Sequence, residues 1–154
     1  MPLKIDYSLI GTGWAKCTIS DGQSEATVSA SYLSDALGNL LIAACAALRE
    51  FRAITFSFDE EPGEFRWVLI SLRPNEYALE ILEFSDLYGD APNSEGTSLF
   101  KSTFLPETFA TAVRDAAAGL LRAVGADGYK EAWHEHPFPM EQFGELERLL
   151  ALNG

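Results

Sequence analysis

Four carboxylates crowd the turn DEEPGE at residues 59–64, where Asp59, Glu60, Glu61 and Glu64 fall within six positions. Hard divalent cations take oxygen ligands, so cation binding is the chemistry that this turn could support. The spacing is not that of an EF-hand loop, which needs its own run of oxygen ligands around a glycine. The stronger prediction is a hairpin tip whose charges block pairing with other strands. Glu60, Glu61 and Glu64 remain candidate contacts for a ligand or partner.

The only two histidines, His134 and His136, flank Glu135 just before a proline-rich bend. In an extended segment both imidazoles would point the same way and could share a metal ion. The segment lacks the H-E-x-x-H spacing that places two histidines one helical turn apart, and the sequence indicates no third ligand. We therefore predict no metal site and no cofactor. Both histidines are kept as candidate contacts in a polar loop.

Aromatic residues give a third set of candidates. Trp14 follows a glycine turn and is predicted to sit at the rim of a sheet, whereas Trp133 falls in a short amphipathic segment. Tryptophan at a rim favours protein interfaces and also lines small-molecule pockets. Packing against the sheet is the favoured interpretation for both Trp67 and Trp133, and Trp133 is also kept as a candidate contact. Arg66, between the apolar positions of its strand, is a candidate polar contact.

Common catalytic signatures are absent from the sequence. It has no G-x-G-x-x-G run, no Walker lysine loop and no G-x-S-x-G nucleophile elbow. Cys17 and Cys45 each lie in an apolar pattern, so both are predicted to be core residues in a reduced compartment. The first residues show no secretory signal pattern. We expect a cytoplasmic domain that is not an enzyme, although missing motifs do not exclude catalysis.

The central stretch 54–84 predicts three antiparallel strands, because apolar residues alternate along it in runs that are split by turns. Residues 3–31 predict a second meander of three strands, in which Asp21-Gly22 is a hairpin signal. Residues 98–105 predict one more strand. The sheet is therefore expected to hold about six to seven strands and to be mostly antiparallel.

Helical spacing appears at residues 34–51, with Ser34 as the expected N-cap, and again from Glu107 to about Val124, where Gly125 ends it. Two short helices are expected after it. The order is three strands, a helix, four strands and then helices, which predicts a single α+β domain over residues 1–154 with the helices on one face of a curved sheet. One core is expected to contain seven marker residues: Leu37, Leu41, Leu48, Phe56, Trp67, Phe109 and Leu120.

The net charge is −12, from 23 acidic and 11 basic residues. Nucleic-acid backbones and anionic membranes attract basic patches, so neither is expected as a partner. A basic protein partner suits this charge. The alternative is that the acidity only keeps the protein soluble.

The leading hypothesis is a non-enzymatic domain that binds a macromolecule, in the first place a protein. Its acidic α+β character without catalytic motifs resembles that of small immunity proteins of toxin systems. That resemblance is one of composition and implies an acidic surface against a basic toxin site. One alternative is a small-ligand-binding protein or enzyme with a pocket between sheet and helices, lined by Arg66, Arg73, Tyr77 and His134. Another is a homodimer formed through an open edge strand of the first meander.

Overall fold

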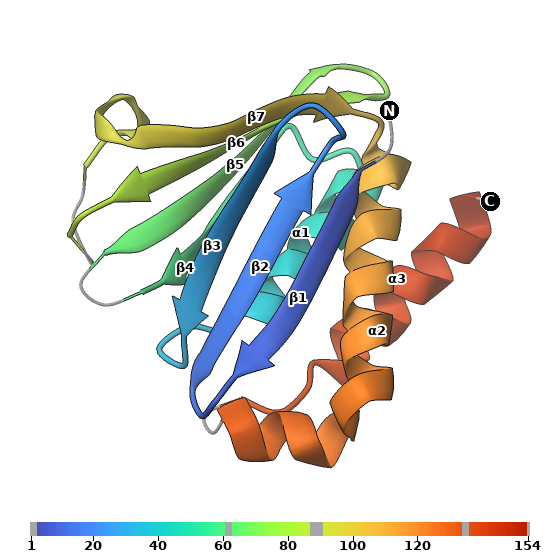
Figure 1. Cartoon of the computed structure of the whole chain (residues 1–154). Helices are drawn as coiled ribbons and strands as arrows, with labels where there is room; N and C mark the ends of the chain where they lie inside the picture. Colours follow the sequence, from blue (N-terminus) through green and yellow to red (C-terminus); the bar gives the residue numbers. More distant parts are fainter. Residues whose placement is uncertain (1–2, 61–62, 87–90, 134–135, 154) are drawn as a thin grey trace.

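The computed structural model describes residues 3–60, 63–86, 91–133 and 136–153, which form two antiparallel sheets and three α-helices. Figure 1 shows the two sheets side by side, with the helices behind and beside the first one. The α+β class and the order of strands and helices predicted from the sequence are confirmed.

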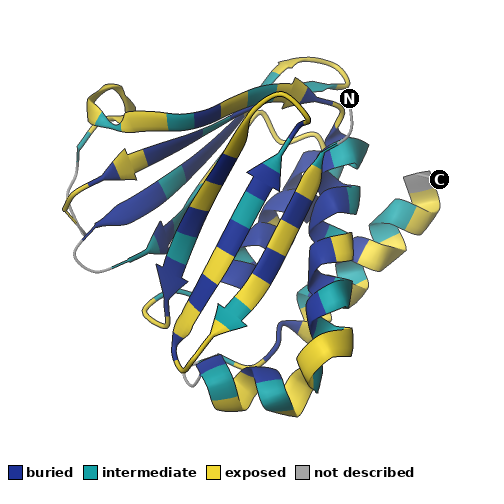
Figure 2. Ribbon diagram, viewed as in Figure 1, coloured by how far each residue is buried: buried dark blue, intermediate teal, exposed yellow. Residues whose placement is uncertain are grey.

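The first sheet has the order β1-β2-β3. Its strands are β1 (Lys4–Ile10), β2 (Trp14–Ser20) and β3 (Glu25–Ser31). Along each strand buried and exposed residues alternate, and Figure 2 shows the resulting stripes. The predicted hairpin turn joins β2 to β3, with Gly22 at a φ of 90° and the Asp21 carboxylate accepting from the Gln23 and Ser24 N–H groups at 2.9 and 2.7 Å.

The second sheet has the order β4-β5-β6-β7. Its strands are β4 (Ala53–Asp59), β5 (Glu64–Arg73), β6 (Glu76–Phe84) and β7 (Thr97–Phe104), with the short 3-10 helix η1 (Asn93–Glu95) before β7. Trp67 on β5 lies opposite Phe56 on β4 and Ile81 on β6. This register brings apolar side chains of all four strands onto one buried face, while Val68, Leu82 and Phe84 form a smaller buried cluster on the opposite face.

Three helices complete the core. They are α1 (Ala36–Leu48), α2 (Pro106–Trp133) and α3 (Met140–Asn153). Gly125, at a φ of 72°, interrupts α2 and divides it into two helical pieces, as the sequence predicts. Of the seven core markers, five are buried, and Leu48 and Phe56 are partly buried against the same cluster. The predicted single core is therefore confirmed.

The strands form two sheets rather than one continuous sheet. β3 and β4 are neighbours in space, but side chains join them instead of a backbone ladder. The Ser31 hydroxyl donates to the Asp59 carbonyl at 2.9 Å, and the Ser34 hydroxyl accepts from the Asp59 N–H at 3.2 Å. Because Ser34 is used in this way, it does not cap α1 as expected. Asp35 caps the helix instead and accepts from the Gly38 N–H at 3.2 Å.

Candidate functional site

The carboxylate of Glu64 is buried and fully engaged. It accepts from the Ser57 hydroxyl at 2.5 Å and forms an ion pair with Arg66 at 3.1 Å. The two charged side chains are only 9% and 13% exposed. A buried carboxylate with these partners is part of the structure of the sheet and offers little surface to a ligand.

Arg66 holds the segment after β6 against the outer face of the second sheet. Its guanidinium donates to the Ala91 carbonyl at 2.8 Å and to the Asn93 side-chain oxygen at 2.9 Å, and lies 4.1 Å from the centroid of the Phe84 ring. Together with the Glu64 ion pair, these contacts use the charge of Arg66 within the chain. We assign Glu64 and Arg66 a structural role.

The remaining described acids of the turn face the junction between the two sheets. Glu60 accepts a short hydrogen bond from the Ser29 hydroxyl on β3. Burial and the neighbouring Glu64 carboxylate raise the pKa of Asp59 above its ordinary value of 3.8. Glu60 remains partly exposed, whereas Glu61 lies outside the described residues.

The acidic turn and the histidine segment are not brought together into a metal site by any described contact. Over the described ranges, no group of three or more histidine, cysteine, aspartate or glutamate side chains could hold a metal ion. His136 is half-buried, and His134 lies outside the described residues. The expectation that no metal binds stays a prediction.

Trp133 lies in the core, with its side chain fully buried. It is paired with Tyr129 at 6.3 Å between ring centroids, and Tyr129 in turn meets Phe138 edge-on at 5.4 Å. The neighbouring Ala132 carbonyl accepts from the Gly13 N–H at 2.6 Å, which fixes the β1–β2 turn to the end of α2. Trp133 therefore has no surface with which to touch a partner.

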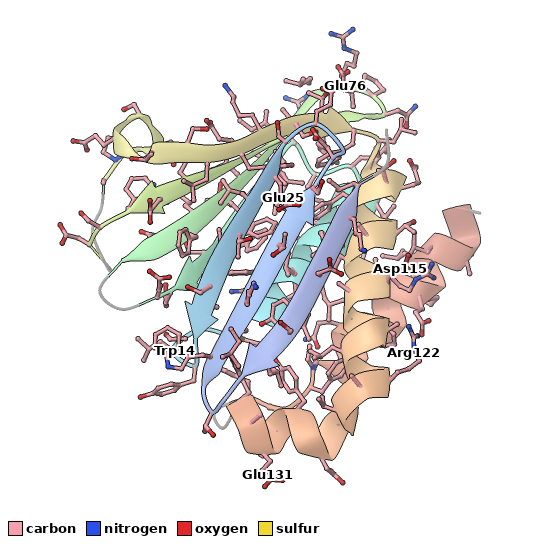
Figure 3. All side chains as sticks on the ribbon, viewed as in Figure 1. Trp14, Glu25, Glu76, Asp115, Arg122 and Glu131 are labelled. Carbon is pink, nitrogen blue, oxygen red and sulfur yellow. The ribbon has the colours of Figure 1, made fainter. Side chains whose placement is uncertain are left out.

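An exposed group of large apolar side chains lies at the end of the first sheet, and we call Ile10, Trp14, Tyr32 and Leu33 the aromatic rim. Trp14 is 40% exposed and Tyr32 is 41% exposed. Ile10 and Trp14 are paired across β1 and β2, and a β-carbon placed on Gly13 would lie 3.2 Å from the Tyr32 ring. Figure 3 labels Trp14 near the lower end of the first sheet, close to the end of β3. Sequence reasoning identified Trp14 and missed Tyr32, whose position directly after a predicted strand was the available signal.

A second surface feature is the groove between strand β1 and helix α2, which we call the β1 groove. It has a volume of about 570 Å³. Every β1 residue from Lys4 to Leu9 lines it, and α2 contributes mostly small side chains, namely Ala112, Ala116, Gly119 and Ala123. Figure 1 shows α2 running alongside the free edge of β1.

Three of the four polar groups proposed to line an internal pocket lie among the described residues, and these three do not converge. The Tyr77 hydroxyl lies 2.5 Å from the Phe51 carbonyl and 3.3 Å from that of Ala47. Arg66 lies on the outer face of its sheet, and Arg73 forms an exposed ion pair with Glu76 at 3.0 Å. This arrangement gives the small-ligand alternative no support from the residues on which it was based.

None of the helices in the described part of the chain is long and apolar enough to cross a membrane. Comparison with known proteins gives no further assignment: no protein-family model, no curated protein and no solved structure matches this chain.

Proposed function

We propose that this chain is a non-enzymatic, cytoplasmic domain that binds a protein partner through the aromatic rim. The observation that carries the proposal is the exposure of both Trp14 and Tyr32 at one end of the first sheet, where Trp14 is paired with Ser31, the residue before Tyr32. Tryptophan and tyrosine dominate the binding energy of protein interfaces, because they bury a large area at a small cost in side-chain entropy. Most other aromatic side chains of the chain are buried in its core.

The charge of the chain supports a basic partner. A net charge of −12 produces a long-range field that accelerates association with a positively charged protein. The two most buried charges near the acidic turn, Glu64 and Arg66, neutralise each other, so the field arises from acids on the surface. An immunity-type inhibitor of a basic toxin is one protein of this kind.

The test is capture of partners from a lysate of the source organism at low salt. The bait is the wild-type chain, compared with a Trp14→Ala/Tyr32→Ala double variant. Leu152→Ala serves as the matched control, because Leu152 is 70% exposed on α3 and lies far along the chain from the rim. We expect a basic protein that the wild type and the control capture and the double variant loses. Recovery of no partner, or equal recovery by all three baits, would contradict the proposal.

A further inference from the structure

The outer edge of β1 carries backbone groups that have no partner in the part of the chain that the structure describes. The Asp21 N–H donates to the Ser24 carbonyl at 3.1 Å, and antiparallel strands alternate between hydrogen-bonded and non-hydrogen-bonded pairs. Every second residue of β2, counted back from Asp21, therefore directs its backbone groups toward β3. These residues are Ile19, Cys17 and Ala15.

The alternate residues of β2 must direct their backbone groups toward β1, and these are Trp14, Lys16, Thr18 and Ser20. Their partners there are Lys4, Asp6, Ser8 and Ile10. The N–H and C=O groups of Ile5, Tyr7 and Leu9 consequently point away from β2 and into the β1 groove. No hydrogen bond between described residues satisfies them.

The opposite wall of the groove leaves room for an additional chain. Four of the seven α2 residues that line the groove are alanine or glycine, and the other three are Asp115, Leu120 and Val124. At Gly119 the nearest atom to an added β-carbon is the Arg122 guanidinium at 3.9 Å, so the space there is open. The combination of unpaired strand groups and a small-residue helix wall matches the geometry of β-strand addition, in which a peptide pairs with an edge strand beside a helix.

We propose that the β1 groove binds an extended segment of a protein partner, which adds to the first sheet as a strand next to β1. The inference rests on the proposed function, since it specifies how the partner is held. β1 spans seven residues, so at about 3.3 Å per residue the added strand could run for roughly 23 Å. The β1 lining of the groove ends at Leu9, next to Ile10 of the aromatic rim, so a segment in the groove reaches the Ile10 end of that surface.

The chemistry of the groove defines the segment. Side chains that point toward α2 must be small or slender, because they lie over Ala112, Ala116 and Gly119. Asp6 and Asp115 line the same groove and pair with Lys4 at 3.8 Å and with Arg114 at 2.7 Å. Both carboxylates are well exposed, and exposed ion pairs are weak, so a lysine or arginine on the solvent-facing side of the segment can compete for them. A second copy of this chain is disfavoured as the occupant, because two chains of net charge −12 repel each other.

The first experiment selects binders from a displayed library of random peptides of about twelve residues, a length that covers β1. Selected peptides are then measured against the wild type, Gly119→Leu and the control Gly144→Leu. Leucine at 119 would fill the groove, while position 144 on α3 is also open space. Both variants should fold, because leucine is a better helix former than glycine. We expect Gly119→Leu to weaken binding by roughly tenfold or more and Gly144→Leu to leave it unchanged.

The second experiment follows amide hydrogen exchange by NMR. In the free chain the Ile5, Tyr7 and Leu9 amides should exchange faster than those of Asp6 and Ser8, which are already bonded to β2. Bound peptide should slow the exchange of the Ile5, Tyr7 and Leu9 amides and leave the exchange of the Asp6 and Ser8 amides unchanged. This alternating pattern is specific to strand addition.

Several results would overturn the inference. One is failure to recover any peptide that the wild type binds and Gly119→Leu does not. Another is protection at the aromatic rim without protection of the three outward amides, which would leave the proposed function standing. A doubled mass in light scattering that Gly119→Leu abolishes would assign the groove to a second copy. If Trp14→Ala/Tyr32→Ala loses lysate capture and Gly119→Leu does not, the groove proposal fails and the proposed function stands.

Discussion

Replacement of Arg66 by methionine tests whether the acidic turn is structural. The substitution keeps much of the apolar stem but removes the ion pair to Glu64, two hydrogen bonds to residues 91 and 93, and the contact with the Phe84 ring. It also leaves the Glu64 carboxylate buried without a counter-charge. Breaking a buried pair from one side costs about 3–5 kcal/mol, so we expect Arg66→Met to lower the free energy of unfolding by about that amount.

The double variant Glu64→Gln/Arg66→Met gives the sharper test. Glutamine can still accept from Ser57, and it removes the stranded charge. Glu64→Gln alone should cost about 1–2 kcal/mol, because Arg66 keeps its other acceptors. The double variant should then lose less than the sum of the two single variants, with a coupling of about 1–3 kcal/mol.

Urea denaturation followed by tryptophan fluorescence measures these losses, since Trp67 and Trp133 are fully buried and report on the core. Arg73→Met is the matched control: it is the same substitution on the same strand, but that side chain is 73% exposed. Its ion pair should contribute less than about 1 kcal/mol. The reasoning is refuted if Arg66→Met costs no more than Arg73→Met, or if the losses at 64 and 66 are simply additive.

Three further predictions concern the core, the turn and metal binding. Trp67→Ala should lower the free energy of unfolding in urea by about 3–5 kcal/mol, and a loss below about 1 kcal/mol would contradict the burial of Trp67. Trp67→Phe should lower it much less, because the indole N–H that phenylalanine lacks has no hydrogen-bond partner among the described residues. Asp59 has a raised pKa in the folded state, so its charged form destabilises the fold. The stability of Asp59→Asn relative to the wild type should therefore increase as the pH rises from below 3.8 through the raised pKa, and should then stay constant. The prediction is refuted if the difference between the two urea midpoints does not change with pH. Calorimetric titration of chelator-treated protein with zinc and with manganese should show no stoichiometric binding, and micromolar binding that is lost in a His134→Ala/His136→Ala variant would refute that expectation.

Turn chemistry and hydrophobic period made much of the fold predictable. The Asp21-Gly22 hairpin and the helix break at Gly125 depend on residues within a few positions of each other, so the sequence contains all the information needed. The alternation around Trp67 likewise predicted which side of β5 is buried. These are local rules with a period of two or of 3.6 residues.

The candidate site was less predictable, because its meaning depends on residues that are distant in the sequence. Glu64 and Arg66 were expected to contact a partner, and the structure shows them occupied with each other and with a segment 25 residues further on. Packing was the favoured interpretation for Trp133, but only the fold identified its neighbour Tyr129, which in turn meets Phe138.

What the sequence determined by itself is the set of elements, their buried faces and the acidic charge, since each follows from residue type and local spacing. Only the tertiary structure decided that the strands divide into two sheets, because that depends on whether β3 and β4 meet through backbone or through side chains. It alone also placed α2 along the free edge of β1 and Tyr32 at the same end of the first sheet as Trp14. Surfaces of this kind arise where elements far apart in the chain come together, and no local pattern encodes which of them will be neighbours.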